Sequence, residues 1–82
     1  MLQVHTIALD EIYVPVSRRK SFDLKTAETL AEDILENGMR IPIQVRQDGA
    51  RYVLVDGQHR VEAAKLLGEK TIQALFVQAR RS

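Results

Sequence analysis

The pattern of hydrophobic residues changes period in the second half of the chain, and this change limits the folds that the sequence can adopt. Residues 43–46 alternate between apolar and polar side chains, Asp48-Gly49 is typical of a hairpin turn, and residues 52–55 return as an apolar run. A helical pattern begins directly after Asp56-Gly57. The stretch therefore predicts a β-hairpin that is followed at once by a helix, with a sharp corner between them.

A second helix is predicted earlier in the chain, over residues 23–36. Asp23 is a plausible N-cap, because its carboxylate can accept hydrogen bonds from the first unpaired amides of a helix. Asn37-Gly38 is a typical helix end, since glycine adopts the left-handed conformation at low cost. The apolar positions fall at helical spacing and form a stripe opposite an acidic face: Ala27, Leu30, Ala31, Ile34 and Leu35.

The other segments complete a small α/β (α+β) domain. Residues 4–9 predict a first strand that is buried largely on both faces, and the stretch 10–23 predicts a loop that leads into the N-cap. After the corner, residues 58–67 predict a helix ended by Gly68, and residues 71–77 predict a last strand. We expect a mixed sheet of about four strands with two packed helices, in one domain over residues 1–82 with its core at 4–77 and a frayed tail at 78–82.

Composition excludes several classes of function. The 82 residues contain no cysteine, which excludes disulfides, thiolate metal sites and thiol redox chemistry. No apolar run approaches the roughly 20 residues that span a bilayer, and the N-terminus does not resemble a signal peptide. We therefore expect a soluble, cytoplasmic protein with no membrane partner.

The positions of the charged residues are more informative than the net charge of the chain. A net charge of +1 does not by itself argue for nucleic acid. Basic residues nevertheless gather at Arg18, Arg19 and Lys20 and again at Arg80-Arg81. Such clusters are usually solvated surface, and non-specific DNA binding is the functional alternative.

The corner at Asp56-Gly57 is the strongest candidate for a binding site. A helix N-terminus presents unpaired N–H groups and the positive end of the helix dipole, which together favour an anion. His59 and Arg60 place positive charge in the first turn, where it is unfavourable unless a negative group binds there. The alternative is that Asp56 caps the helix and Arg60 is solvated. No metal site is expected, since Asp56 and His59 lack a third ligand.

Three stretches carry a resemblance that covers residues 7–77. They are "RRKSFD", "LAEDILENGMRIPIQVR" and "YVLVDGQHRVEAAKLLGEKTIQALFV". The chain resembles the N-terminal domain of ParB-type partition proteins, within the ParB/sulfiredoxin superfamily. That family has Gly-Glu-Arg-Arg, or Gly-Cys-His-Arg in sulfiredoxins, where this chain has "GQHR".

The resemblance implies a nucleotide site at the corner. It implies a nucleoside triphosphate or diphosphate (CTP, ATP or ADP) as ligand, with Mg²⁺ as a companion. The residues that it assigns to the phosphates and their surroundings are Gly57, Gln58, His59, Arg60, Arg19, Thr26 and Thr29.

Gln58 distinguishes the chain from both parts of the superfamily. Without the cysteine, sulfinic-acid reduction is excluded, and a carboxamide cannot accept a proton as the ParB glutamate can. Slow NTP hydrolysis stays open, with Gln58 and His59 as the catalytic candidates. We expect a nucleotide-switched module of DNA partition or regulation, with a homodimer or another protein as partner. An NTPase, phosphotransferase or nuclease using the same pocket, and an interaction domain without ligand, are the alternatives.

Overall fold

The computed structural model describes residues 3–15, 23–38 and 41–77, and within them the chain forms a five-stranded mixed sheet with two α-helices. The elements follow the order β1 (Val4–Ala8), η1 (Leu9–Glu11), β2 (Ile12–Tyr13), α2 (Leu24–Asn37), β3 (Ile43–Asp48), β4 (Arg51–Asp56), α3 (Gln58–Leu66) and β5 (Thr71–Phe76). The predicted α+β class is confirmed. The expected tail at 78–82 lies outside the described residues.

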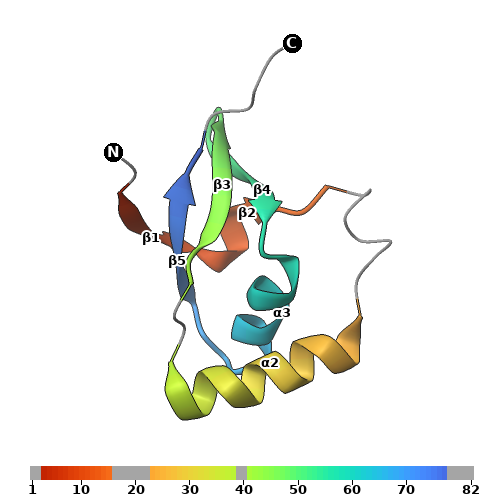
Figure 1. Cartoon of the computed structure of the whole chain (residues 1–82). Coiled ribbons are helices and arrows are strands. Elements are labelled where there is room, and N and C mark those ends of the chain that lie inside the picture. The colour runs from red at the N-terminus through yellow and green to blue at the C-terminus, as the bar shows by residue number, and fades with distance from the viewer. Residues whose placement is uncertain (1–2, 16–22, 39–40, 78–82) are drawn as a thin grey trace.

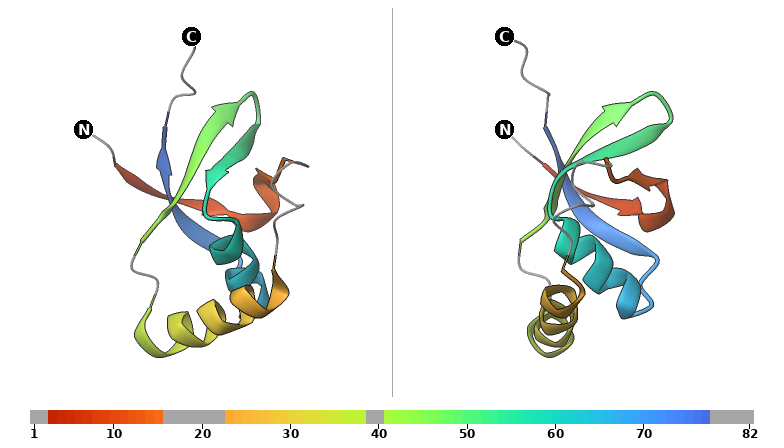
Figure 2. Two further views of the ribbon diagram at one scale, coloured as in Figure 1. Left: turned by 45° about the vertical axis from the view of Figure 1, so that its right-hand side comes forward. Right: turned by 90° about the vertical axis from the view of Figure 1, so that its right-hand side faces the viewer.

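The sheet has the order β1-β5-β3-β4-β2 (Figure 1). β1 is antiparallel to β5, β5 is parallel to β3, β3 is antiparallel to β4, and the short β2 is parallel to β4. Both helices lie at one end of the sheet, while the β3–β4 hairpin points away from them (Figure 2). The start of α3 is therefore held where β4 leaves the sheet.

The core is aliphatic and lies between the sheet and α3. Ile43, Val45 and Val61 are fully buried, so the hairpin and the helix that follows it share one packed interior. Each such side chain contributes about 1.5–3 kcal/mol through burial. The core cluster consists of Ile7, Leu9, Val14, Ile43, Val45, Leu54, Val61, Ala64, Ile72 and Ala74.

Helix α2 confirms the prediction at both ends but not along its whole apolar stripe. The Asp23 carboxylate accepts a hydrogen bond from the Lys25 N–H at 3.2 Å, and the Gly38 N–H donates to the Ile34 carbonyl at 2.7 Å. Leu35, however, is 76% exposed. Because α2 packs mainly against α3, only a narrow strip centred on Ala27 and Ala31 is buried.

Two predictions for the N-terminal part of the chain were wrong. β1 is not buried on both faces: Val4, His5 and Thr6 are exposed, because β1 is an edge strand paired only with β5. β2 lies in the stretch that was expected to be a loop. The hairpin turn also differs slightly, since Asp48 still belongs to β3 and Gly49-Ala50 form the turn.

The sheet brings together aromatic side chains that are far apart in the sequence. The His5 ring stacks on Phe76 with 4.6 Å between centroids, and Tyr52 lies 5.4 Å from Phe76 in a tilted arrangement. Tyr52 and Phe76 also pack against the core cluster. These rings face one another, so they extend the hydrophobic packing along the sheet.

Candidate phosphate-binding site

The corner between β4 and α3 is built around Gly57. This residue has φ 112°, a backbone conformation that side chains disfavour. A Cβ atom at this position would lie 2.6 Å from Cγ2 of Ile43. Two constraints therefore require glycine at this position: the backbone conformation and the close contact with the buried strand β3.

Helix α3 begins at this corner without a side-chain cap. Gly57 is the N-cap residue, its carbonyl accepts the Val61 N–H at 3.0 Å, and no described side chain caps the helix. The alternative in which Asp56 caps α3 is therefore wrong, because Gly57 occupies the N-cap position. The first N–H groups of α3, at the positive end of its dipole, can therefore donate to another acceptor.

The three residues that follow Gly57 differ in their surroundings. Gln58 is 8% exposed, and His59 and Arg60 are half-buried. Within the described part of the chain, the ion pairs are Arg51–Asp48 and Lys65–Glu62, and neither involves Arg60. A guanidinium in the first turn of a helix without an anionic partner is suited to bind phosphate.

His59 connects this corner to the start of α2. Its Nε2 atom accepts a hydrogen bond from the backbone N–H of Asp23 at 3.1 Å, across 36 residues of sequence. The N-termini of α2 and α3 are thereby held together. The sequence predicted His59 at the corner but contained no local signal for this partner.

Asp23 is itself held in a defined geometry at the start of α2. The Thr26 hydroxyl donates to its carboxylate at 2.7 Å, and the Lys25 N–H donates to the other oxygen. The hydrogen bond from Thr26, followed by that from the Lys25 amide, lowers the pKa of the Asp23 carboxyl, with burial acting in the opposite direction. The ionised form is therefore the one that caps α2.

We expect Asp23→Ala to lower the thermal midpoint at neutral pH, because α2 loses its cap. Since the pKa of Asp23 is lower in the folded protein, its contribution is present above the unfolded value and is lost as the pH falls through the folded one. The difference between Asp23→Ala and the wild type should therefore shrink below about pH 4. Thermal melts from pH 7 to pH 2 measure it.

Asp23→Ser is the matched control, because serine caps helices without carrying a charge. Its midpoint should lie close to that of the wild type at neutral pH, without the acid-dependent contribution. Identical midpoints for Asp23→Ala and the wild type at neutral pH would contradict the role of this cap.

Thr26 and Thr29 lie on the N-terminal half of α2. Both line an open hollow of about 680 Å³ that also includes Asp23, Lys25, Leu30 and Asp33. The Thr26 hydroxyl is used by the cap, whereas Thr29 lies on the exposed face. Arg19, the other residue assigned by resemblance, lies outside the described residues.

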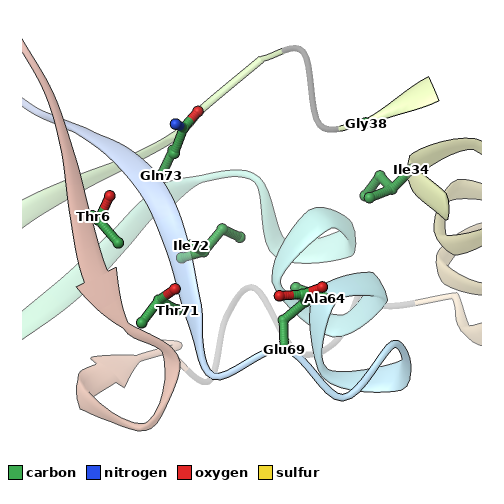
Figure 3. Close-up of a pocket in the computed structure, with 8 residues that line it drawn as sticks. All are labelled: Thr6, Ile34, Gly38, Ala64, Glu69, Thr71, Ile72 and Gln73. Atoms are coloured by element: carbon green, nitrogen blue, oxygen red, sulfur yellow. The ribbon is translucent and has the colours of Figure 1, made fainter.

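A separate hollow of about 440 Å³ lies at the opposite end of α2 (Figure 3). Gly38, the C-cap of α2, is part of its lining, and so is the carboxylate residue Glu69. No lysine or arginine is among the described residues that line it, and a helix C-terminus disfavours anions. This hollow is therefore poorly suited to phosphate, in contrast to the corner at Gly57.

Sequence comparison identifies the family. The profile of the ParB N-terminal domain matches residues 1–82. The chain belongs to this family. The probable chromosome-partitioning protein ParB of Helicobacter pylori is 36% identical over 76 residues, which are 92% of this chain and 26% of that protein. Stage 0 sporulation protein J of Bacillus subtilis is 38% identical over 61 residues, 74% of this chain and 22% of that protein. The chain thus spans about a quarter of the length of these curated ParB relatives.

Solved structures show the same ParB/sulfiredoxin fold. Sulfiredoxin from Arabidopsis thaliana superposes with a TM-score of 0.82 at 28% identity, covering 94% of this chain and 86% of that one. The C-terminally truncated chromosome-partitioning protein ParB from Caulobacter crescentus, complexed with CTP-γ-S, gives 0.81 at 26% identity, covering 95% and 46%. The predicted resemblance is confirmed. No helix in the described part of the chain is long and apolar enough to cross a membrane.

Proposed function

We propose that this ParB-type domain binds a nucleoside triphosphate or diphosphate, with the phosphates at the N-terminus of α3. The observation that carries the proposal is the corner itself: α3 starts at Gly57 with no side-chain cap from the described residues, and Arg60 stands in its first turn without a described ion-pair partner. The CTP-γ-S complex of the Caulobacter ParB supports the same ligand class.

The names of the relatives support a role in DNA partition or regulation. Proteins that match this chain are named for chromosome partitioning and nucleoid occlusion. We place the domain in DNA partition or regulation, as a module whose interactions with DNA or a protein partner change when nucleotide binds.

The test is a calorimetric titration of the domain with CTP, ATP, ADP and GTP, each with and without Mg²⁺. Saturable binding that weakens when the phosphates are removed, as with cytidine in place of CTP, is the expected result. Binding of none of the four nucleotides would contradict the proposal and favour an interaction domain without ligand.

Gln58 should limit hydrolysis rather than binding. Its backbone N–H lies at the helix N-terminus, but its carboxamide cannot act as a general base, which is typically worth about 10²–10⁴-fold in rate. We therefore expect slow turnover by the wild type, with Gln58→Glu raising the single-turnover rate at saturating nucleotide. A carboxylate at this position is compatible with the positive end of the α3 dipole.

Gln73→Glu, on the exposed surface of β5, is the control for the added negative charge and should leave the rate unchanged. Fast wild-type turnover that Gln58→Glu does not alter would show that hydrolysis depends on other groups, and would favour an enzyme that uses the same pocket.

A further inference from the structure

The hollow at the C-terminal end of α2 lies between this helix and the paired strands β1 and β5 (Figure 3). We call it the α2 C-terminal hollow. Thr6 and Gln73 are partners in the pairing of β1 with β5 and line one side, while Ile34 and Gly38 line the other. The hollow is separate from the corner at Gly57, and the proposed nucleotide site gives it no role.

Glu69 gives this hollow a negative charge. The backbone holds the residue in place, because its N–H donates to the Ala64 carbonyl at 3.0 Å and the Lys70 carbonyl accepts the Leu9 N–H at 2.9 Å. The Glu69 side chain points toward the hollow (Figure 3). The two ion pairs of the described residues do not include it. Within the described part of the chain, this carboxylate is therefore available to a cation.

The end of α2 adds to the negative potential. A helix C-terminus carries partial negative charge, which a basic residue in the last turn can offset. Helix α2 has no basic residue in its last turn, and that turn contains the exposed carboxylate of Glu36. A cation is therefore favoured at this end of α2, for the same electrostatic reason that an anion is favoured at the start of α3.

Aliphatic side chains lie beside this negative region. Ile34 and Ile72 line the hollow. Leu35 near the end of α2 is 76% exposed, and Ile41 shortly before β3 is 58% exposed. Lysine and arginine side chains combine a long aliphatic stem with a cationic head, so they match both the apolar walls and the carboxylate.

We propose that the α2 C-terminal hollow is a docking site for a protein segment that carries a lysine or arginine next to an aliphatic residue. The basic side chain enters the hollow and pairs with Glu69, and its aliphatic neighbour covers Leu35 and Ile41. A free amine would leave these two side chains in water, and the acidic surroundings repel the phosphates of DNA. The site lies away from the corner at Gly57, so the inference does not depend on nucleotide.

The probe is an acetylated, amidated peptide of sequence Gly-Leu-Arg-Leu-Gly, titrated into the nucleotide-free domain while amide chemical shifts are recorded. The expected result is a saturable shift of the amides of Thr6, Glu69 and Gln73, with those of residues 57–60 unchanged. Replacing the arginine of the peptide by glutamine removes the charge, and Gly-Gly-Arg-Gly-Gly removes the aliphatic contacts. Each of these peptides should bind about 5-fold more weakly than the complete one.

Two pairs of variants test the two halves of the site. Glu69→Gln should weaken binding of the complete peptide about 5-fold, because it removes the carboxylate and keeps the size of the side chain. Its control is Glu28→Gln, an exposed position of α2 outside the hollow, which should stay within about 2-fold of the wild type. Leu35→Gln should weaken binding about 3-fold through lost apolar contact, whereas Leu24→Gln, at the other exposed end of α2, should not.

Arg40 follows Gly38 closely in the sequence and lies outside the described residues. The proposal predicts that Arg40→Gln leaves the affinity for the peptide within about 2-fold of the wild type. Binding that occurs only in Arg40→Gln would assign the hollow to an arginine of the same chain and overturn the proposal.

Equal binding of the arginine and glutamine peptides, or equal affinities of Glu69→Gln and Glu28→Gln, would overturn the inference. Binding of Gly-Gly-Arg-Gly-Gly as tightly as the complete peptide would contradict a protein partner and show a site for small cations. Shifts of the same amides when the domain alone is concentrated would assign the hollow to a second copy instead. A lack of shifts at millimolar peptide would overturn the inference as well, whereas failure of nucleotide to bind bears on the proposed function alone.

Discussion

Gly57→Ala should destabilise the domain by about 2–5 kcal/mol, the sum of two costs at one residue. The first is the backbone, because φ is 112° and a side chain disfavours this conformation. The second is space, because the added Cβ would lie 2.6 Å from Cγ2 and 3.3 Å from Cα of Ile43, which is itself fully buried. Urea unfolding followed by circular dichroism measures the loss.

Gly68→Ala is the matched control for this effect. Gly68 also has a positive φ, of 77°, but a Cβ there would meet no atom within 4 Å. It should therefore show only the backbone cost, about 1–2 kcal/mol. Equal losses for Gly57→Ala and Gly68→Ala would contradict a close contact between the corner and β3.

Arg60→Ala should weaken nucleotide binding on the order of 10- to 100-fold, because a hydrogen bond to a charged phosphate is worth roughly 1.5–3 kcal/mol. Stability should change little or increase, since a positive side chain in the first turn of α3 opposes the helix dipole. Calorimetric titration and thermal melts of the same samples measure the two effects.

Lys65→Ala is the control for net charge. It removes one positive charge from the same helix, but Lys65 lies in the last turn of α3 and pairs with Glu62 at 3.6 Å. Its nucleotide affinity should stay within about 2-fold of the wild type, as expected for an exposed surface pair. An affinity loss in Lys65→Ala as large as that in Arg60→Ala would show that Arg60 acts only through the overall charge.

Local signals in the sequence were sufficient for most of the fold. Asp23 and Gly38 marked the ends of α2, and the change of period at Gly57 marked the start of α3. β2 was not predicted, because its two residues form a strand only through pairing with β4. The exposure of Leu35 depends likewise on which elements pack against α2, and helical spacing alone does not contain that information.

For the candidate site, too, the features that depend on adjacent residues were predictable, and the contacts that depend on tertiary packing were not. The glycine corner and Arg60 were predicted from adjacent residues, since a helix start is a local feature. The hydrogen bond between His59 and the Asp23 amide joins residues 36 positions apart, and only the packing of α2 on α3 brings them together. The contact of His59 with the Asp23 amide therefore could not be predicted from the residues around the corner.

Amide chemical shifts of residues 57–60 during titration with CTP or ATP test whether phosphate binds at the N-terminus of α3. Phosphate at the N-terminus of α3 predicts that the largest changes occur at these four amides. Amides around the hollow at the far end of α2, such as those of Thr6 and Gln73, should barely move. Saturation with nucleotide that leaves residues 57–60 unchanged, or that shifts mainly the amides of the distant hollow, would contradict the account.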